Sequence, residues 1–183
     1  KHGFRNGPVH LPRSLVADSV ATNEGDLDCV FIKPGYDLPV EILDAATGEP
    51  LHTLAGTEKV EELLYRDGTL LLLKGDPAKV LNPVVAERRG EKDYVPKTLL
   101  AYDAASGELI WETKADQLGH VVSLTPAVDQ EGRVFAQSPE VLTCLDITSG
   151  DVNWAVENKC KPGANHSTAC LVTVADVVVI GDG

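Results

Sequence analysis

Residues 99–111 read LLAYDAASGELIW, and the rest of the chain is organised around this stretch. A short aliphatic strand leads to Asp103, whose side chain can accept hydrogen bonds from the backbone N–H groups two or three residues on. Ser106 does the same more weakly, and Gly107 supplies the positive φ that closes the turn. A second strand, residues 108–113, follows at once. The stretch therefore predicts a β-hairpin.

The same turn occurs twice more along the chain. Residues 40–52 read VEILDAATGEPLH, and residues 141–154 read VLTCLDITSGDVNW. The copies align on their aspartates and turn glycines, which are Asp44 and Gly48, Asp103 and Gly107, and Asp146 and Gly150. The aspartates are 59 and 43 residues apart, and a period in the low forties is typical of a four-stranded propeller blade. An insertion at about 75–97, with the prolines and charges of a solvated loop, accounts for the longer spacing.

A further hairpin pattern precedes each of these turns. Residues 62–73 carry a favoured Asp-Gly turn between two apolar runs, and residues 125–136 read as strand, turn, strand. Residues 14–32 are the earliest copy, and residues 172–180 begin the pattern again. Two hairpins per unit make four antiparallel strands. The sequence therefore predicts an all-β fold, a β-propeller of four-stranded antiparallel blades, with blades at about 14–54, 60–113 and 121–156 and the start of another at 168–183.

Composition narrows the functional classes. The chain has 183 residues, of which 43% are hydrophobic and 24% charged, as expected for a globular protein. Its formal net charge of −12 repels phosphate backbones and anionic lipids, which excludes nucleic acid as a partner. The sequence has no signal peptide and no apolar run of about 18 residues that could span a membrane.

The two ends of the sequence suggest a segment of a larger protein. Methionine is absent, including at position 1, and the chain stops soon after the apolar run 177–180. About three and a half blades cannot close a ring, and an open row would expose apolar faces and strand edges. We therefore expect further blades, or another chain, to complete the propeller.

The aligned copies also carry a family resemblance. The pattern Ala101-x-Asp103-x-x-x-Gly107-x-x-x-Trp111 resembles the tryptophan-docking motif of propellers with pyrroloquinoline-quinone-like (PQQ-like) repeats. The copy that ends in Trp154 matches with Cys144 as its first residue, whereas the first copy ends in His52. The resemblance covers most of the chain. It implies that Trp111 and Trp154 pack between adjacent blades, each with its indole N–H on a backbone carbonyl.

The resemblance leaves the function open, because the repeat occurs in quinoprotein dehydrogenases and in propellers that bind no quinone. The dehydrogenases use a disulfide between adjacent cysteines, an Asp base and a set of Ca²⁺ ligands, and none of these aligns here. We therefore expect a non-catalytic module without catalytic, cofactor-binding or metal-binding residues. Two alternatives stay open. The chain could be part of a dehydrogenase using PQQ and Ca²⁺ whose active residues lie elsewhere, or a propeller fused to a catalytic domain such as a methyltransferase.

The four cysteines fall into two groups. Cys29 and Cys144 lie in strand-like runs, where a buried free thiol is expected. Cys160 and Cys170 bracket a short loop, and a disulfide between them would contribute about 2–3 kcal/mol and indicate an oxidising compartment. Two free thiols, or a metal site that includes His166, are the alternatives, although three ligands make a poor zinc site. The N-x-S sequence at Asn165 is interpreted as coincidence.

These observations favour a binding or scaffold surface within an exported bacterial protein, periplasmic or otherwise extracytoplasmic. The expected partners are proteins or other domains of the same polypeptide. Propellers usually bind their partners at the channel mouth or on inter-blade loops. The loops at 75–97 and 160–170 are therefore the candidate contact surfaces.

Overall fold

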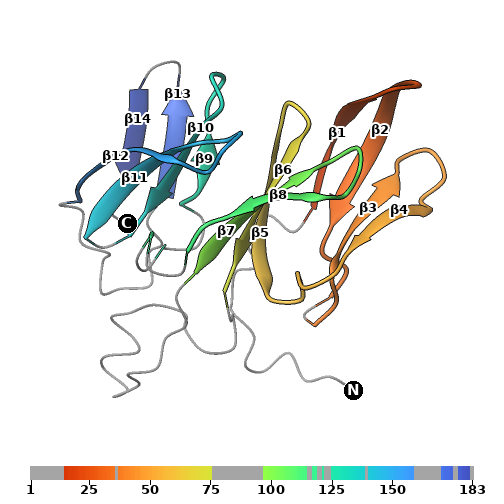
Figure 1. Cartoon of the computed structure of the whole chain (residues 1–183), viewed down its shortest axis with the longest axis horizontal. Helices are drawn as coiled ribbons and strands as arrows, with labels where there is room; N and C mark the ends of the chain where they lie inside the picture. The colour runs from red at the N-terminus through yellow and green to blue at the C-terminus, as the bar shows by residue number, and fades with distance from the viewer. Residues whose placement is uncertain are drawn as a thin grey trace.

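The computed structural model describes residues 15–35, 37–75, 97–114, 117–118, 121, 125–138, 140–158, 170–174 and 177–181. Every regular element in these residues is a β-strand, and the strands form separate antiparallel sheets that lie side by side (Figure 1). The described residues include no helix of the length and apolar character needed to cross a membrane. The predicted all-β fold with four-stranded antiparallel sheets is confirmed.

Each sheet is a meander in which every strand pairs with its neighbours in sequence, and we call the sheets blades 1 to 4. Blade 1 consists of β1 (Leu15–Thr22), β2 (Gly25–Ile32), β3 (Val40–Asp44) and β4 (Pro50–Leu54). Blade 2 consists of β5 (Val60–Arg66), β6 (Thr69–Lys74), β7 (Thr98–Asp103) and β8 (Leu109–Glu112). Blade 3 consists of β9 (Ala127–Val128), β10 (Arg133–Gln137), β11 (Val141–Asp146) and β12 (Val152–Glu157). Blade 4 contributes the hairpin of β13 (Cys170–Val174) and β14 (Val177–Gly181).

The second hairpin of each complete blade has an irregular register at one fixed place. The shift follows Ile42, Ala101 or Cys144, each of which lies two residues before the aspartate of its turn. A bulge of this kind bends the strand and increases its twist. The turn between β7 and β8 extends towards blade 1 (Figure 1). The repeated bulge therefore gives all three hairpins the same local shape.

Blade 2 is buried on both faces because it lies between blades 1 and 3. The side chains of β6 and β7 that enter the core with blade 1 are Leu70, Leu72, Leu100 and Tyr102. Those that enter the core with blade 3 are Leu71, Leu73, Leu99 and Ala101. Successive residues of a strand point to opposite faces, so a strand that is buried twice needs a continuous apolar run. This requirement explains the four consecutive leucines of β6.

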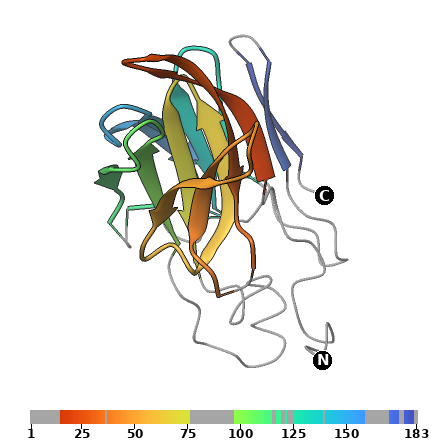
Figure 2. The same cartoon turned by 90° about the vertical axis from the view of Figure 1, so that its right-hand side faces the viewer.

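The first strand of each blade lies on the inner side of the row. Contacts join β1 to β5, β5 to β9, and β9 to β13, and the sheets lie one behind another when they are seen from the side of blade 1 (Figure 2). Tyr65 of β5 ties the first two blades together. Its ring stacks on Phe31 with the centroids 4.8 Å apart. Its hydroxyl donates to the carbonyl of Ser19 and accepts the N–H of Gly68, both at 3.0 Å.

The two ends of the predicted insertion meet at Glu61. Lys97 Nζ lies 2.7 Å from Glu61 Oε2, and the side chains are only 12% and 6% exposed. Gly75 donates its N–H to the carbonyl of Lys59 at 3.0 Å, and a Cβ on this glycine would come within 2.3 Å of Glu61 Oε1. The ladder between β6 and β7 is complete up to the last pair of residues before the insertion. The insertion itself, residues 76–96, lies outside the described residues.

The two-sided core makes a specific prediction for adjacent leucines. Leu71 and Leu72 are 1% and 0% exposed and point to opposite faces. We expect Leu71→Ala and Leu72→Ala each to lower the free energy of unfolding by about 2–5 kcal/mol, measured by urea denaturation. Val174→Ala is the control, because this side chain is 60% exposed and should change stability by less than about 0.5 kcal/mol. If only one of the two leucines mattered, the sheet would not be covered on both faces.

Candidate functional site

The three Asp turns share one geometry. In each, the glycine donates its N–H to the carbonyl of the aspartate four residues earlier, at 2.8–2.9 Å, and has a φ of +71° to +74°. The aspartate Oδ1 accepts backbone N–H groups two or three residues on, at 2.7–3.1 Å, in Asp44, Asp103 and Asp146. The carboxylates of the repeat are therefore occupied in holding their own turns.

These hydrogen bonds stabilise the ionised form of two of the aspartates. The backbone N–H of Thr47 lowers the pKa of Asp44 below its usual value, aided by the N–H of Ala46. The hydroxyl of Thr148 lowers the pKa of Asp146, together with the backbone N–H groups of Thr148 and Ser149. A carboxylate held ionised in this way is suited to fixing a turn and poorly suited to exchanging protons near neutral pH.

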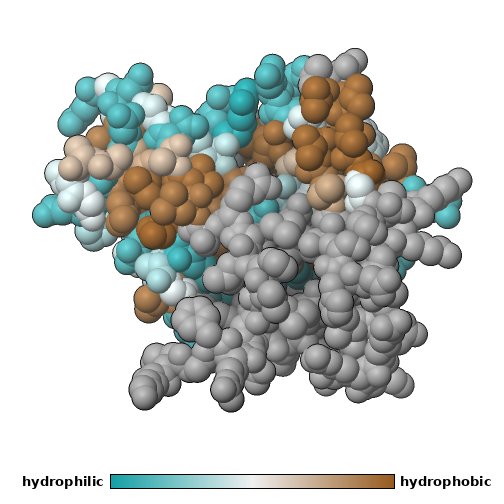
Figure 3. Space-filling model, turned by 180° about the vertical axis from the view of Figure 1, so that it is seen from behind, coloured by the Kyte–Doolittle hydropathy of each residue, from teal (hydrophilic) through white to brown (hydrophobic). Residues whose placement is uncertain are grey.

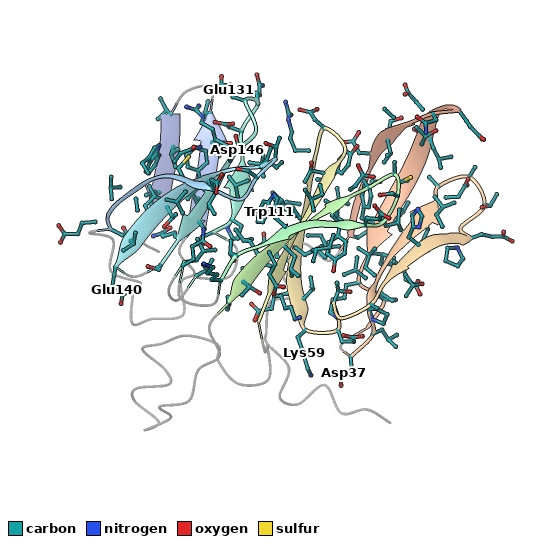
Figure 4. All side chains as sticks on the ribbon, in the orientation of Figure 1. Asp37, Lys59, Trp111, Glu131, Glu140 and Asp146 are labelled. Atoms are coloured by element: carbon teal, nitrogen blue, oxygen red, sulfur yellow. The ribbon has the colours of Figure 1, made fainter. Side chains whose placement is uncertain are left out.

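Trp111 of β8 connects blade 2 to the turn of blade 3. Its indole N–H donates to the carbonyl of Ile147 at 2.8 Å. Its ring lies on Gly150 so closely that a Cβ on this glycine would be 2.7 Å from two ring atoms. The tryptophan and the Asp146 turn occupy neighbouring positions between the two blades (Figure 4). Gly150 is thus required twice, for its positive φ and for the approach of the ring.

His52 makes the corresponding contact between blades 1 and 2. It follows Asp44 by eight residues, as Trp111 follows Asp103. His52 Nε2 lies 2.9 Å from the carbonyl oxygen of Ala105, and a Cβ on Gly107 would be 2.8 Å from His52 Cγ. Because a carbonyl only accepts, Nε2 carries the proton. In the sequence His52 departs from the motif, and this role was not predicted, although the spacing of His52 from Asp44 was the available signal.

Trp154 of β12 occupies the third equivalent position but has a different environment. It lies beside Phe135 of its own blade, with the ring centroids 5.9 Å apart and tilted, and it is 40% exposed. No turn glycine of a following blade lies against it within the described part of the chain.

A polar hollow of about 500 Å³ lies beside the Trp111 contact. The side-chain amide of Gln117 connects two sides of this hollow. Its Nε2 donates to the carbonyl of Gly150 at 3.4 Å, and its Oε1 accepts the N–H of Lys114 at 3.1 Å. Its lining residues are Glu112, Lys114, Gln117, Ser149, Gly150 and Asp151. Charged and hydroxyl groups of this kind suit a small polar molecule better than an apolar one.

The structure tests the predictions for cysteines only in part. Cys29 and Cys144 are buried free thiols, as expected, and burial raises the pKa of each so that the nucleophilic thiolate is disfavoured. Cys170 is exposed. Residues 159–169 lie outside the described residues. The disulfide from Cys160, the metal site with His166 and the contact loop at 160–170 therefore remain predictions. Among the described residues, no three His, Cys, Asp or Glu side chains are grouped to hold a metal.

The turns, blades and inter-blade contacts define a propeller built from PQQ-like repeats. The profile of the family described as outer membrane protein assembly factor BamB matches residues 39–183. The chain belongs to this family of PQQ-like repeat propellers. No curated protein sequence matches the chain.

The chain is similar to the solved structures of three proteins. The crystal structure of BamB from Moraxella catarrhalis is similar with a TM-score of 0.50 and 13% identity, over 91% of this chain and 43% of that one. A europium-containing methanol dehydrogenase has a TM-score of 0.47 and 13% identity, over 80% of this chain and 35% of that one. The computationally designed Ika8 protein has a TM-score of 0.41 and 14% identity, over 86% and 53%. The chain thus spans less than half the length of the BamB structure that it resembles.

The turn glycines allow the strain of the backbone to be separated from the approach of the ring. Gly48 and Gly150 have the same φ of +74°, but nothing lies within 4 Å of a Cβ built on Gly48. We expect Gly48→Ala to cost the backbone strain alone, about 1 kcal/mol. Gly150→Ala should cost at least about 1 kcal/mol more, because the methyl group displaces Trp111. The measurement is urea unfolding, and equal losses would contradict the close contact.

A second prediction concerns the Asp146 turn. The pKa of Asp146 is lower in the folded state than the usual value, so its ionised form contributes stability above the unfolded pKa, and this stability is lost as the pH falls through the folded pKa. Thr148→Val removes the largest cause. In the variant, carboxyl NMR titration should give a higher pKa for Asp146, and stability should fall less on acidification. Thr47→Val, which acts on the turn of blade 1, is the control and should leave the Asp146 pKa unchanged. An unaltered Asp146 pKa in Thr148→Val would refute the assignment.

Proposed function

We propose that the chain is a non-catalytic propeller module that binds proteins, or other domains of its own polypeptide, within a larger exported bacterial protein. The observation that carries the proposal is the use made of its reactive side chains. The repeated aspartates hold their own turns, and His52 links blades 1 and 2 by its contact with the turn of blade 2. The thiols of Cys29 and Cys144 are buried, and burial raises the pKa of each. Groups that could serve acid–base or nucleophilic catalysis are thus used for architecture.

The family supports a role in protein binding. Its description names an assembly factor for outer membrane proteins, and the BamB structure with a similar fold bears the same name. We extend from these names a protein-binding role and an extracytoplasmic, periplasmic location to this chain. The PQQ-like repeat itself serves both enzymes and binding proteins, so the fold alone does not select between them.

The outer strands offer a mode of binding. Within the described residues, β4, β8 and β12 each pair with a single neighbour, so one backbone edge of each is free. Leu51, Leu109 and Ile110 on the first two of these strands are 40–49% exposed. A free edge with apolar side chains can accept an extended segment of another protein as an added strand. We propose this mode for the partners of the module.

Two measurements test the proposal. Incubation with PQQ and Ca²⁺ followed by gel filtration should leave no quinone absorbance with the protein, and dye-linked oxidation of alcohols and sugars should be absent, with a quinoprotein dehydrogenase as the positive control. A photo-crosslinking residue at Ile110, in the full-length protein in its own cells, should give covalent adducts with other polypeptides or domains. The same residue at Thr22, beside the first hairpin turn and away from the outer edges, is the control. Bound quinone with turnover would overturn the non-catalytic role, and equal crosslinking at both positions would overturn the edge-binding mode.

A further inference from the structure

The polar hollow lies at the boundary between blades 2 and 3, beside the contact of Trp111 with the Asp146 turn (Figure 4). Lys114 and Gln117 reach it from the segment that follows β8, whereas residues 149–151 belong to the turn of blade 3. Its volume of about 500 Å³ lies within the range of roughly 300–1,000 Å³ that is usual for small-molecule sites. The hollow can therefore hold a small ligand that touches both blades.

Two charged side chains of the hollow are not used by the fold. In the part of the chain that the structure describes, the Lys114 ammonium and the Asp151 carboxylate form no ion pair and no side-chain hydrogen bond. The side-chain amide of Gln117 donates one of its two hydrogens, to Gly150, and so keeps a second N–H for a ligand. Opposite charges that line one hollow without pairing offer a cation and an anion to a third molecule.

The contact between blades does not require these side chains. When the two copies are aligned on their turn aspartates, Ala55 corresponds to Lys114. Glu58 corresponds to Gln117 in the same way. His52 makes its contact with the turn of blade 2 although no lysine stands at this position. The cation and the amide therefore belong to one blade boundary and not to the repeat.

Glu112 also lines the hollow, but its charge acts on the other side of blade 2. Burial, followed by the charge of Glu112, raises the pKa of Tyr102, which lies in the core shared with blade 1. Asp151 is therefore the carboxylate that meets a ligand from the side of blade 3.

The hollow differs in character from the apolar surface over β13 and β14 (Figure 3). Four valines that are 52–60% exposed contribute to that surface, namely Val172, Val174, Val177 and Val179. Nothing in the described chain identifies what covers them. The hollow, in contrast, defines the chemistry of its ligand by its own charges.

We propose that the polar hollow binds a small zwitterion of the α-amino acid class. The carboxylate of the ligand lies against the Lys114 ammonium and the remaining N–H of Gln117, and its ammonium lies against the Asp151 carboxylate. Hydrogen bonds between ionised groups are about twice as strong as neutral ones, and the flexible stem of lysine lets its ammonium follow the ligand. The polar lining favours a polar ligand side chain. The proposal concerns this hollow alone and does not rest on the proposed function.

Isothermal titration calorimetry of the full-length protein tests the proposal. Each standard L-α-amino acid is titrated at millimolar concentration, and the tightest binder is compared with two of its own derivatives. The amide of the amino acid lacks the carboxylate, and the N-acetyl derivative lacks the ammonium. We expect the parent amino acid to bind about tenfold or more tightly than either derivative, because each derivative has lost one charge-assisted contact.

Two variants assign each end of the ligand to a side chain. In Lys114→Met the amino acid and its amide should bind equally, and the amide should keep its wild-type affinity, which reports that the hollow remains folded. In Asp151→Asn the amino acid and its N-acetyl derivative should bind equally. Such non-additive changes measure the contact itself. Lys59→Met and Asp26→Asn remove the same charges at exposed positions outside the hollow and should keep both tenfold preferences.

Three outcomes would overturn the proposal. The first is the absence of saturable binding for every amino acid. The second is a preference for the amino acid over its amide that persists in Lys114→Met, which would place the ligand carboxylate elsewhere. The third is tighter binding of the amide or of the N-acetyl derivative than of the parent, which would show that the hollow takes a ligand with a single charge.

Discussion

The spacing between blades 1 and 2, and between blades 2 and 3, depends on one kind of contact, in which a flat ring from the outer strand of one blade lies on the turn glycine of the next. A side chain on that glycine would overlap the ring of Trp111 or His52. A ring nitrogen also bonds a backbone carbonyl of the same turn. Trp111 Nε1 lies 2.8 Å from the carbonyl oxygen of Ile147, and His52 Nε2 lies 2.9 Å from that of Ala105. Neighbouring hairpins are therefore held at van der Waals distance and in a fixed orientation, and the cores between the sheets form at that separation.

In blade 2, which is held at this distance on both sides, β6 and β7 bury both of their faces. The leucines of β6 divide between two cores, and the inner strands meet along the other end of the row, where Tyr65 joins Phe31 and Ser19. Several buried polar side chains bond backbone groups of neighbouring segments, as the hydroxyl of Thr113 does with Leu99 and the side-chain amide of Asn158 with Ser138. In the described residues, Asp44, Asp103 and Asp146 hold their own turns and His52 contacts the next blade, so these side chains serve the same architecture.

Local features were predictable from the residues themselves, whereas the inter-blade contact of Trp111 was expected only from the family resemblance and that of His52 was missed. The Asp turns follow from hydrogen bonds within five residues, so their pattern alone predicts the hairpins and their repetition predicts the blades. The strand expected near Thr125 is shorter than its apolar pattern suggests, since β9 spans only Ala127–Val128. Pro126 lacks an N–H for the ladder, and the Thr125 hydroxyl bonds the carbonyl of Gln137 instead. The role of His52 was missed because the motif specifies tryptophan. The contact between blades requires only a flat ring that carries an N–H donor, and histidine supplies one.

The closure at Glu61 has a consequence for how such a blade can diversify. Gly75 and Lys97 meet at one buried carboxylate, and the ladder between β6 and β7 is already complete where the chain departs. The free energy of closing a loop grows only slowly with its length. Sequence between these two anchors can therefore lengthen, shorten or be replaced with little cost to the sheet, and a new recognition element can be acquired at this point by insertion alone. The ion pair of Glu61 and Lys97 thus marks the point at which this blade can accept an insertion.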